Sequence, residues 1–168
     1  MAFKNKYNWF FYGKDTKMLE DFTKQFTTKP IPYIRIENRF YLKNKQLDKI
    51  SFSNIIPALF GCYLGMIKGN TFHPSFGLLD LLSEISKQKI IVNDRGEIDF
   101  LYGKHIRKKH VIEIKGSKEK GILKLVQNEH DENLGYGKFI GISENKAQLM
   151  RHILDRGIFI KRDKNQIL

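Results

Sequence analysis

Apolar positions along the chain recur either at helical spacing or in alternation with polar ones, and the two patterns predict different elements. In the first half, Asp15 is a candidate N-cap for a helix, because Met18, Leu19, Phe22 and Phe26 follow it at helical spacing. The same reasoning predicts, in chain order, a helix over 15–27, a hairpin with strands 33–36 and 39–42, a helical or mixed segment over 44–56, a helix over 75–86 and a strand over 89–92.

Pro57 to Asn70 is apolar but interrupted by Gly61, Gly65 and Gly69. Glycines inside an apolar run indicate a strand or turn in which two backbones approach closely. A phosphate-binding loop is the alternative, but the segment has no G-x-x-x-x-G-K-[ST] match. Close packing is therefore the favoured interpretation.

The second half has shorter apolar runs separated by polar turns. Residues 93–96 are predicted to be a polar turn and the boundary between two domains, 1–94 and 95–168. Beyond it, short strands are predicted over 111–114, 122–126, 134–142 and 157–160, with a turn at 127–133 and a short turn or helix capped by Ser143. Many short strands with tight turns predict a small closed sheet or barrel. The fold class is therefore α+β, with an N-terminal α/β domain that contains an antiparallel sheet.

The charge of the chain indicates which class of partner it binds. The 168 residues carry a formal net charge of +12, and both halves share the excess. Such a surface favours nucleic acid first and an anionic membrane second. The membrane reading is weak, because Pro57, Gly61 and Gly65 break the longest apolar stretch. The single cysteine, Cys62, is expected to be buried, and it excludes an internal disulfide or a cysteine-rich zinc site. An intracellular protein is expected.

The densest charge lies in FLYGKHIRKKHVIEI, residues 100–114. Its cations are too close together to be buried, while the apolar residues on both sides attach the segment to a folded body. A solvated loop is the alternative. A second group of cations lies near the C-terminus, and Lys138 stands between the two. The candidate RNA-binding residues are Lys104, Arg107, Lys108, Lys109, His110, Lys138, Arg151, Arg156, Lys161 and Arg162.

Two further expectations complete the candidate surface. A compact β fold is expected to bring the two groups of cations together into one groove. Tyr102, Tyr136 and His110 are candidate groups on which bases stack, although packing in the core or at its rim is favoured for both tyrosines. Gly135 and Gly137 allow either close approach of RNA or bending of a strand, and bending is favoured.

The second half resembles a PUA domain, a small RNA-binding β pseudo-barrel. The resemblance rests on FLYGKHIRKKHV, on LKLVQNEHDENLGYGKFIGIS and on the terminal GIFIKRD. Together with IPALFGCYLGMIKGNTFHPSFGLLDLLSE, these segments are similar to the Nip-seven ribosome-biogenesis family, over roughly residues 30–168. The resemblance implies a non-enzymatic factor that binds precursor rRNA of the large ribosomal subunit through the PUA face.

Two other functions stay open. One is the RNA-binding subunit of an RNA-modifying complex of the pseudouridine synthase type, and the other is a stand-alone modifying enzyme with a catalytic N-terminal half. No catalytic, metal or cofactor motif supports an enzyme. Other assembly factors are expected to bind the N-terminal domain, in which Trp9, Phe10 and Phe11 are either core or contact residues. The chain alone is expected to be monomeric, and cytoplasmic or, in a eukaryote, nucleolar.

Overall fold

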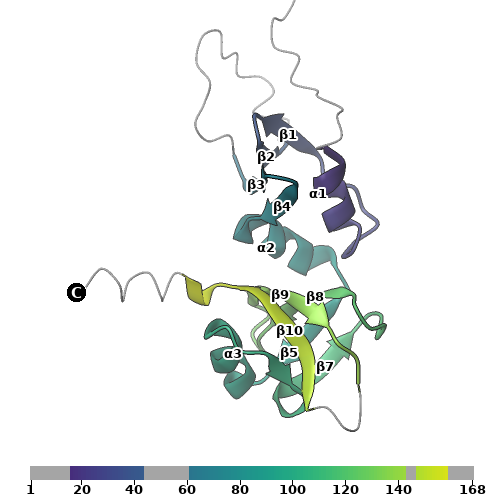
Figure 1. Ribbon diagram of the computed structural model, residues 1–168, viewed down its shortest axis with the longest axis vertical. Helices are drawn as coiled ribbons and strands as arrows, with labels where there is room; N and C mark the ends of the chain where they lie inside the picture. The colour runs from purple at the N-terminus through teal and green to yellow at the C-terminus, as the bar shows by residue number, and fades with distance from the viewer. Residues whose placement is uncertain (1–15, 44–60, 143–146, 159–168) are drawn as a thin grey trace, which may run out of the picture. The chain divides into compact units, whose positions relative to one another are not determined.

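The computed structural model describes residues 16–43, 61–142 and 147–158 (Figure 1). The chain forms two compact units, which divide between Leu78 and Leu79 inside one helix, and residues 25–27 belong to the second unit. The boundary expected after residue 94 therefore falls within the second unit. The reason is the strand Lys89–Val92, which pairs with two strands of the second sheet instead of ending the first domain.

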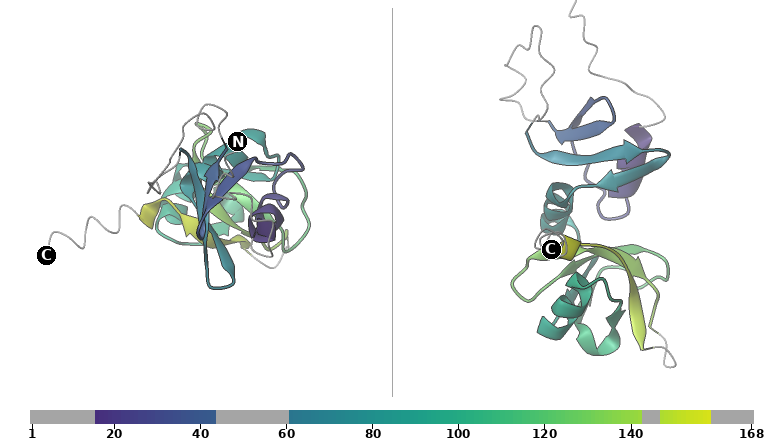
Figure 2. Two further views of the ribbon diagram at one scale, coloured as in Figure 1. Left: turned by 90° about the horizontal axis from the view of Figure 1, so that it is seen from above. Right: turned by 60° about the vertical axis from the view of Figure 1, so that its left-hand side comes forward.

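In the described part of the first unit, the helix α1 and the start of α2 (Phe76–Ile85) accompany an antiparallel sheet (Figure 2). The sheet has the strand order β1-β2-β3-β4. Its elements are α1 (Thr16–Thr23), β1 (Tyr33–Ile36), β2 (Arg39–Leu42), β3 (Tyr63–Lys68) and β4 (Thr71–Pro74). The predicted helix and hairpin are confirmed, and β4 was not predicted. Phe72 of β4 lies against Phe22 of α1 and Phe40 of β2, with ring centroids 5.5 and 5.7 Å away.

Gly65 shows why the apolar segment before β4 contains glycine. Its φ is +143°, and a β-carbon there would lie 2.4 Å from the carbonyl oxygen of His73. The predicted close approach of two backbones is thus confirmed for this position. Cys62, which was expected to be buried, is exposed, because it precedes β3 instead of lying inside the sheet. The predicted segment 44–56 lies outside the described residues, as do Trp9, Phe10 and Phe11.

The second unit is built on a six-stranded sheet with the order β6-β10-β9-β8-β5-β7. The strands pair antiparallel except for β5 with β8. Its elements are the end of α2 (Phe76–Ile85), then β5 (Lys89–Val92), α3 (Asp94–Leu101), β6 (Ile106–Arg107), a 3₁₀ turn (Lys108–His110), β7 (Val111–Lys115), β8 (Leu123–Gln127), β9 (Asn133–Phe139) and β10 (Gln148–Asp155).

The two ends of this strand order are joined directly, because only the 3₁₀ turn separates β6 from β7. The sheet is therefore curled into a pseudo-barrel, and the predicted fold class is confirmed. One core fills it, with α3 packed beside the strands (Figure 1). Its buried residues are Ile90, Val92, Phe100, Ile106, Val126, Leu134, Phe139, Leu149 and Met150.

Helix α3 replaces the polar turn expected at 93–96. Asn93 is its N-cap, and the side-chain oxygen accepts a hydrogen bond of 2.9 Å from the Gly96 N–H. Asp94 and Glu97 occupy the first turn, where negative charge is favourable. Gly96 is required for packing, because a β-carbon there would lie 2.8 Å from Cβ of His110.

The last strand also differs from the expectation. It is β10 rather than 157–160, since Gly157 and Ile158 are helical and the following residues lie outside the described chain. The glycines of β9 explain how β10 is accommodated. A β-carbon on Gly135 or Gly137 would lie 2.0 Å from the Leu154 oxygen or 2.3 Å from the Arg151 oxygen. These contacts show that the two glycines leave room for the backbone of β10, and bending of the strand stays a prediction.

Candidate nucleic-acid interface

Three of the predicted cations lie on one outer face of the second sheet. Arg107 pairs with Gln148 at the start of β10, and Arg151 of β10 pairs with Lys138 of β9. The strand residues next to these cations, Ile106, Met150 and Phe139, are all buried in the core. Successive side chains of a strand point to opposite faces, so Arg107, Lys138 and Arg151 share the outward face. We call these three residues the basic row.

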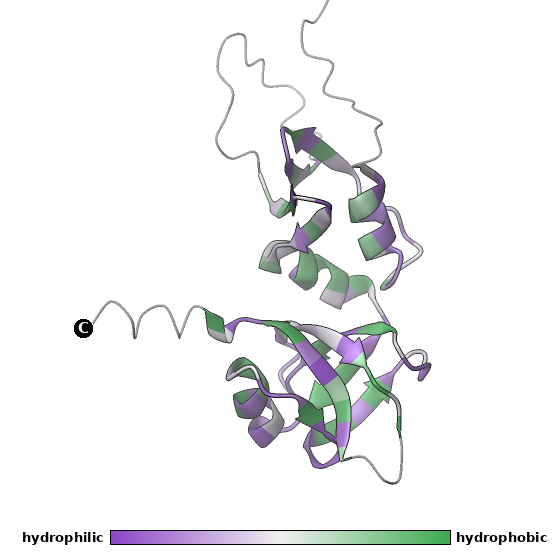
Figure 3. Cartoon of the chain, viewed as in Figure 1, coloured by the Kyte–Doolittle hydropathy of each residue, from purple (hydrophilic) through white to green (hydrophobic). Residues whose placement is uncertain are grey.

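The basic row is open to solvent. All three side chains are exposed, and within residues 16–43, 61–142 and 147–158 none of them forms an ion pair. Neighbouring strands lie about 4.8 Å apart, so Arg151 and Lys138 are close together, and Arg107, opposite Gln148, adds a third positive charge on the next strand. Hydrophilic bands interrupt the hydrophobic ones along β10 (Figure 3). The arrangement is suited to binding a chain of negative charges.

Lys108 and Lys109 continue from Arg107 in the 3₁₀ turn. The Lys108 N–H donates to the Ala147 oxygen at 2.9 Å, which places the turn beside the first residues of β10. Lys109 is exposed and Lys108 is half-buried. Both of these predicted residues therefore lie at the same end of β10 as Arg107.

Lys104 differs from the basic row because a carboxylate compensates its charge. Its Nζ lies 3.0 Å from Asp99 of α3, and Arg95 and His110 lie 3.8 and 3.5 Å from the same carboxylate. The hydrogen bond from Lys104 is the largest of the effects that lower the pKa of Asp99. Asp99 thus anchors the segment that follows α3, and Lys104 contributes to that anchor.

His110 is not available to stack on a base, which corrects the sequence prediction. The residue is only 1% exposed. Its Nδ1 accepts a bond of 3.4 Å from the Arg107 N–H, and its Nε2 faces Asp99. Burial is the main cause that lowers the pKa of this imidazole. His110 therefore supports the turn beneath Arg107 and makes no direct contact with solvent.

The two candidate stacking tyrosines differ in burial. Tyr136 is 8% exposed, with its ring edge-on to Phe26 at 6.4 Å, so it packs at the core as favoured from the sequence. Tyr102 is 58% exposed, at the end of α3. Tyr102 is the predicted stacking residue that the structure leaves accessible.

Arg156 lies at the opposite end of β10 from Arg107. The strand has eight residues, or roughly 23 Å at about 3.3 Å per residue. The Arg156 Nε donates to the Asn133 oxygen at 2.7 Å, and its Nη2 pairs with Asp80. The expected union of Arg107–Lys109 with Arg156 in one groove is thus not found. Lys161 and Arg162, the other members of that cluster, lie outside the described residues.

The surroundings of Arg156 are acidic. A cavity of about 550 Å³ adjoins it, and the carboxylates that line this cavity belong to Asp80, Glu84, Glu97, Asp131 and Glu132. The turn 128–132 is held by its own side chains, since Asn128 accepts from the N–H groups of His130 and Glu132 at 3.0 Å. This region repels a polyanion.

Two features of the described residues bear on other functions. No group of three or more His, Cys, Asp or Glu side chains in that part of the chain is arranged to hold a metal ion. None of the helices there combines the length and the hydrophobicity that crossing a membrane requires.

Sequence reasoning missed one exposed cation beside the basic row, Lys120. Its Cβ lies 3.8 Å from the position that a β-carbon on Gly141 would take, just beyond β9. The available signal was the short run Ser117 to Gly121, in which two lysines and a terminal glycine come directly before a strand.

Solved structures of low sequence identity share this fold. A conserved PUA domain protein from Thermoplasma acidophilum has a TM-score of 0.55 at 14% identity, over 89% of this chain and 94% of that one. A PUA domain from Aeropyrum pernix K1, solved with tartrate, has a TM-score of 0.57 at 13% identity, over 84% and 81%. A hypothetical protein from Pyrococcus horikoshii OT3 has a TM-score of 0.52 at 10% identity, over 84% and 89%.

Sequence comparison points to the second unit. A curated relative, the 60S ribosome subunit biogenesis protein nip7 of Schizosaccharomyces pombe, is 32% identical over 76 residues. The match covers 45% of this chain and 42% of the relative, less than half of its length. Residues 88–164 match the family described as UPF0113 PUA domain. The resemblance drawn from the sequence is therefore confirmed at the level of similarity: residues 88–164 are similar to the UPF0113 PUA domain, and 76 residues of the chain are similar to a Nip-seven protein.

Proposed function

We propose that this protein is an RNA-binding assembly factor that acts on precursor rRNA of the large ribosomal subunit. The observation that carries the proposal is the basic row, three exposed cations on adjacent strands of a PUA-type domain. The relative from Schizosaccharomyces pombe is described as a 60S ribosome subunit biogenesis protein, which supports the choice of RNA.

The physical basis is neutralisation of phosphates. Arg107, Lys138 and Arg151 have no carboxylate partner among the described residues, so binding of RNA does not have to break an existing ion pair. Each phosphate that is neutralised releases counterions, and affinity then falls as salt rises. Because the row crosses the strands of a curved sheet, a flexible single strand follows it more easily than a stiff duplex does.

The protein acts without catalysis in this proposal. It holds RNA through the second unit, and the first unit contacts other assembly factors. We place it as a monomer in the cytoplasm, or in the nucleolus if its source is eukaryotic. Nothing among the described residues favours the alternative, a subunit of an RNA-modifying complex of the pseudouridine synthase type.

The test has two parts, both with the full chain. In vitro, fluorescence anisotropy with labelled oligouridine is expected to show binding whose log affinity falls by about 0.7 for each neutralised phosphate per decade of salt, or about 2 for the row. In cells, crosslinking followed by sequencing of the bound RNA is expected to recover precursor rRNA of the large subunit. Absence of RNA binding, or recovery of RNA together with a modifying enzyme alone, would contradict the proposal.

A further inference from the structure

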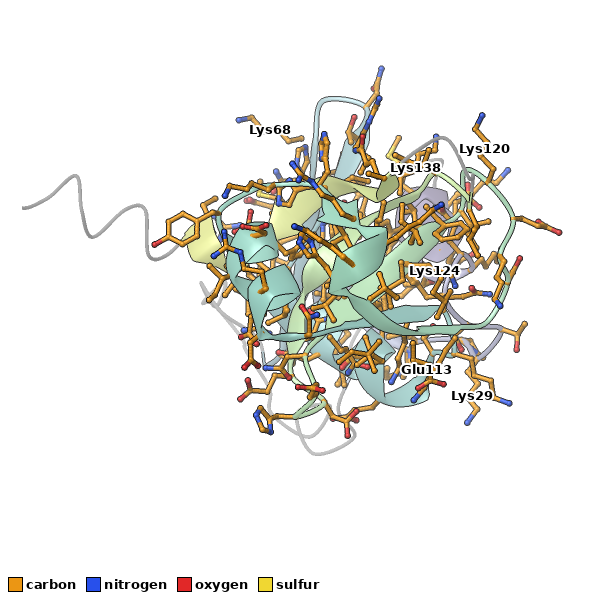
Figure 4. All side chains as sticks on the ribbon, turned by 90° about the horizontal axis from the view of Figure 1, so that it is seen from below. Lys29, Lys68, Glu113, Lys120, Lys124 and Lys138 are labelled. Carbon is orange, nitrogen blue, oxygen red and sulfur yellow. The ribbon has the colours of Figure 1, made fainter. Side chains whose placement is uncertain are left out.

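Lys120 extends the basic row along the sheet. A β-carbon on the next residue, Gly121, would lie 3.7 Å from Cε of Lys138, and the Gly121 N–H donates to the Phe139 oxygen at 2.8 Å. Figure 4 shows the side chains of Lys120 and Lys138 projecting on the same side of the second unit. Lys120 is exposed and forms no ion pair within the described residues. A chain of phosphates bound at Lys138 therefore passes within reach of Lys120.

The segment that carries Lys120 is fastened from inside by another lysine. Lys124 of β8 (labelled in Figure 4) has 0% exposure. Its ammonium lies 5.8 Å from the centre of the Phe139 ring. Its Nζ donates to the Lys115 carbonyl oxygen and, at 3.1 Å, to Oε1 of Gln88. The same Oε1 accepts the Ser117 N–H at 3.1 Å. These contacts fix the beginning of the segment 115–121.

A buried ammonium is an unfavourable choice for stability alone. Removal from water disfavours the charged form, and burial lowers the pKa of Lys124 to about 8. A methionine has a similar length and fills such a site without that penalty. What the methionine lacks is the pair of bonds to Gln88 and to the Lys115 carbonyl. Lys124 therefore contributes more to positioning the segment 115–121 than to the stability of the core.

We propose that Lys120 is a fourth phosphate-binding residue, and that the buried Lys124 is a positioning residue that holds segment 115–121 beside the basic row. The inference rests on the RNA binding proposed above. It adds a contact that none of the sequence patterns singled out, and it gives the buried lysine a role in binding.

The first part is tested with Lys120→Gln in the full chain, and Lys115→Gln is the matched control. Lys115 is an exposed lysine on β7 that already pairs with Glu113 at 3.4 Å. Binding to labelled oligouridine is measured by anisotropy from low to moderate salt. Lys120→Gln is expected to reduce the salt slope by about 0.7 and to weaken binding severalfold, while the control leaves the slope unchanged.

The second part is tested with Lys124→Met. Its resistance to urea is expected to equal or exceed that of the wild type, yet its RNA affinity is expected to fall as far as that of Lys120→Gln. Combining the two substitutions is expected to cause little further loss, since both act through one contact. Hydrogen exchange at the Ser117 amide is expected to speed up. If Lys124→Met does not fold, Gln88→Met removes the shared acceptor and is measured in the same way.

The outcomes separate this inference from the proposed function. If the wild type binds RNA and Lys138→Gln weakens it, but Lys120→Gln behaves as Lys115→Gln does, the fourth contact is refuted and the function stands. If Lys124→Met, and Gln88→Met where it is needed, keeps wild-type affinity and slope, the positioning role is refuted. If the wild type binds no RNA, the proposed function itself fails.

Discussion

Arg151 and Arg156 are close in sequence, and their surroundings are opposite in charge. Arg151 lies opposite Lys138 on the outer face of the sheet, without an acidic partner among the described residues. Arg156 is bonded to the Asn133 oxygen and to Asp80, beside a cavity lined with carboxylates. We therefore take a cation as a candidate RNA contact only where no acceptor of the protein already binds it.

The two ends of β10 therefore differ in charge: one is basic and is expected to attract a polyanion, and the other is acidic and is expected to repel it. The basic row collects positive charge near the start of β10, whereas the acidic cavity lies beyond its end. A bound RNA strand is therefore expected to stop before Arg156. Each of the following substitutions tests one side of this contrast.

The largest effect is expected from reversing the basic row with Arg107→Glu, Lys138→Glu and Arg151→Glu together. Affinity for oligouridine is expected to fall by about 100-fold or more, and the salt slope by about 2, because three phosphate contacts are lost. Anisotropy titrations at several salt concentrations measure both. The control reverses three exposed lysines of the first unit, Lys17, Lys24 and Lys68. Equal losses in both variants would show that only net charge matters, and the contrast would be broken.

A smaller effect is expected from pH on folding stability, through the buried Lys124. Burial lowers the pKa of Lys124 to about 8 in the folded protein, from the ordinary lysine value of 10.5 that applies in the unfolded chain. The unfolded chain then binds more protons between these values, so folding stability from this residue rises with pH there. Between pH 8 and 9.5 we expect a gain of about 1–2 kcal/mol over Lys124→Met, measured by urea unfolding. If the free energy of unfolding changes with pH in the same way in the wild type and in Lys124→Met, this prediction is wrong.

On the acidic side, Arg156→Gln is expected to act on stability and not on RNA. The ion pair with Asp80 is partly exposed, so the loss of unfolding free energy is expected to be about 1 kcal/mol, mostly from the bond to the Asn133 oxygen. Affinity and salt slope for oligouridine are expected to match the wild type. A loss as large as that of Arg151→Gln would extend the RNA surface to this end and remove the contrast.

The smallest effect is expected at Asp99, beneath Lys104. Its pKa is lowered in the folded protein from 3.8, so its contribution to stability is present above that value and is lost as pH falls through the folded pKa. Asp99→Asn is expected to cost less than about 1 kcal/mol at pH 7, because Lys104 is largely exposed. Thermal unfolding at pH 7 and pH 3 measures it, and a variant that loses as much at pH 3 as at pH 7 would contradict the reasoning.

Short runs rich in apolar residues and bounded by polar turns were sufficient to predict β1, β2, β7, β8 and β9, although β8 and β9 are buried on both faces. The same pattern failed at β10, where the pairing with β9 shifts register between His152 and Leu154 and interrupts the period of two. The sequence pattern also failed to predict α3, because asparagine and glycine, the residue types at 93 and 96, are common in turns. Only the packing of Gly96 on His110 explains a glycine in this helix.

The candidate site was partly predictable. Arg107, Lys138 and Arg151 were named from charge alone, but their alignment depends on strand register, which the sequence does not reveal. The position of His110 follows from its packing against α3, which contributes Gly96 and, eleven positions before His110, Asp99. Long-range pairing is the information that was missing in both cases.

Gly137 has a consequence for recognition as well as for folding. The bare α-carbon leaves room for the Arg151 oxygen, which a methyl group would approach to 2.3 Å. A side chain at this place would push the two strands apart and widen the interval between Lys138 and Arg151. The missing β-carbon of Gly137 therefore keeps β9 and β10 close together, and this fixes the spacing between the charges of Lys138 and Arg151.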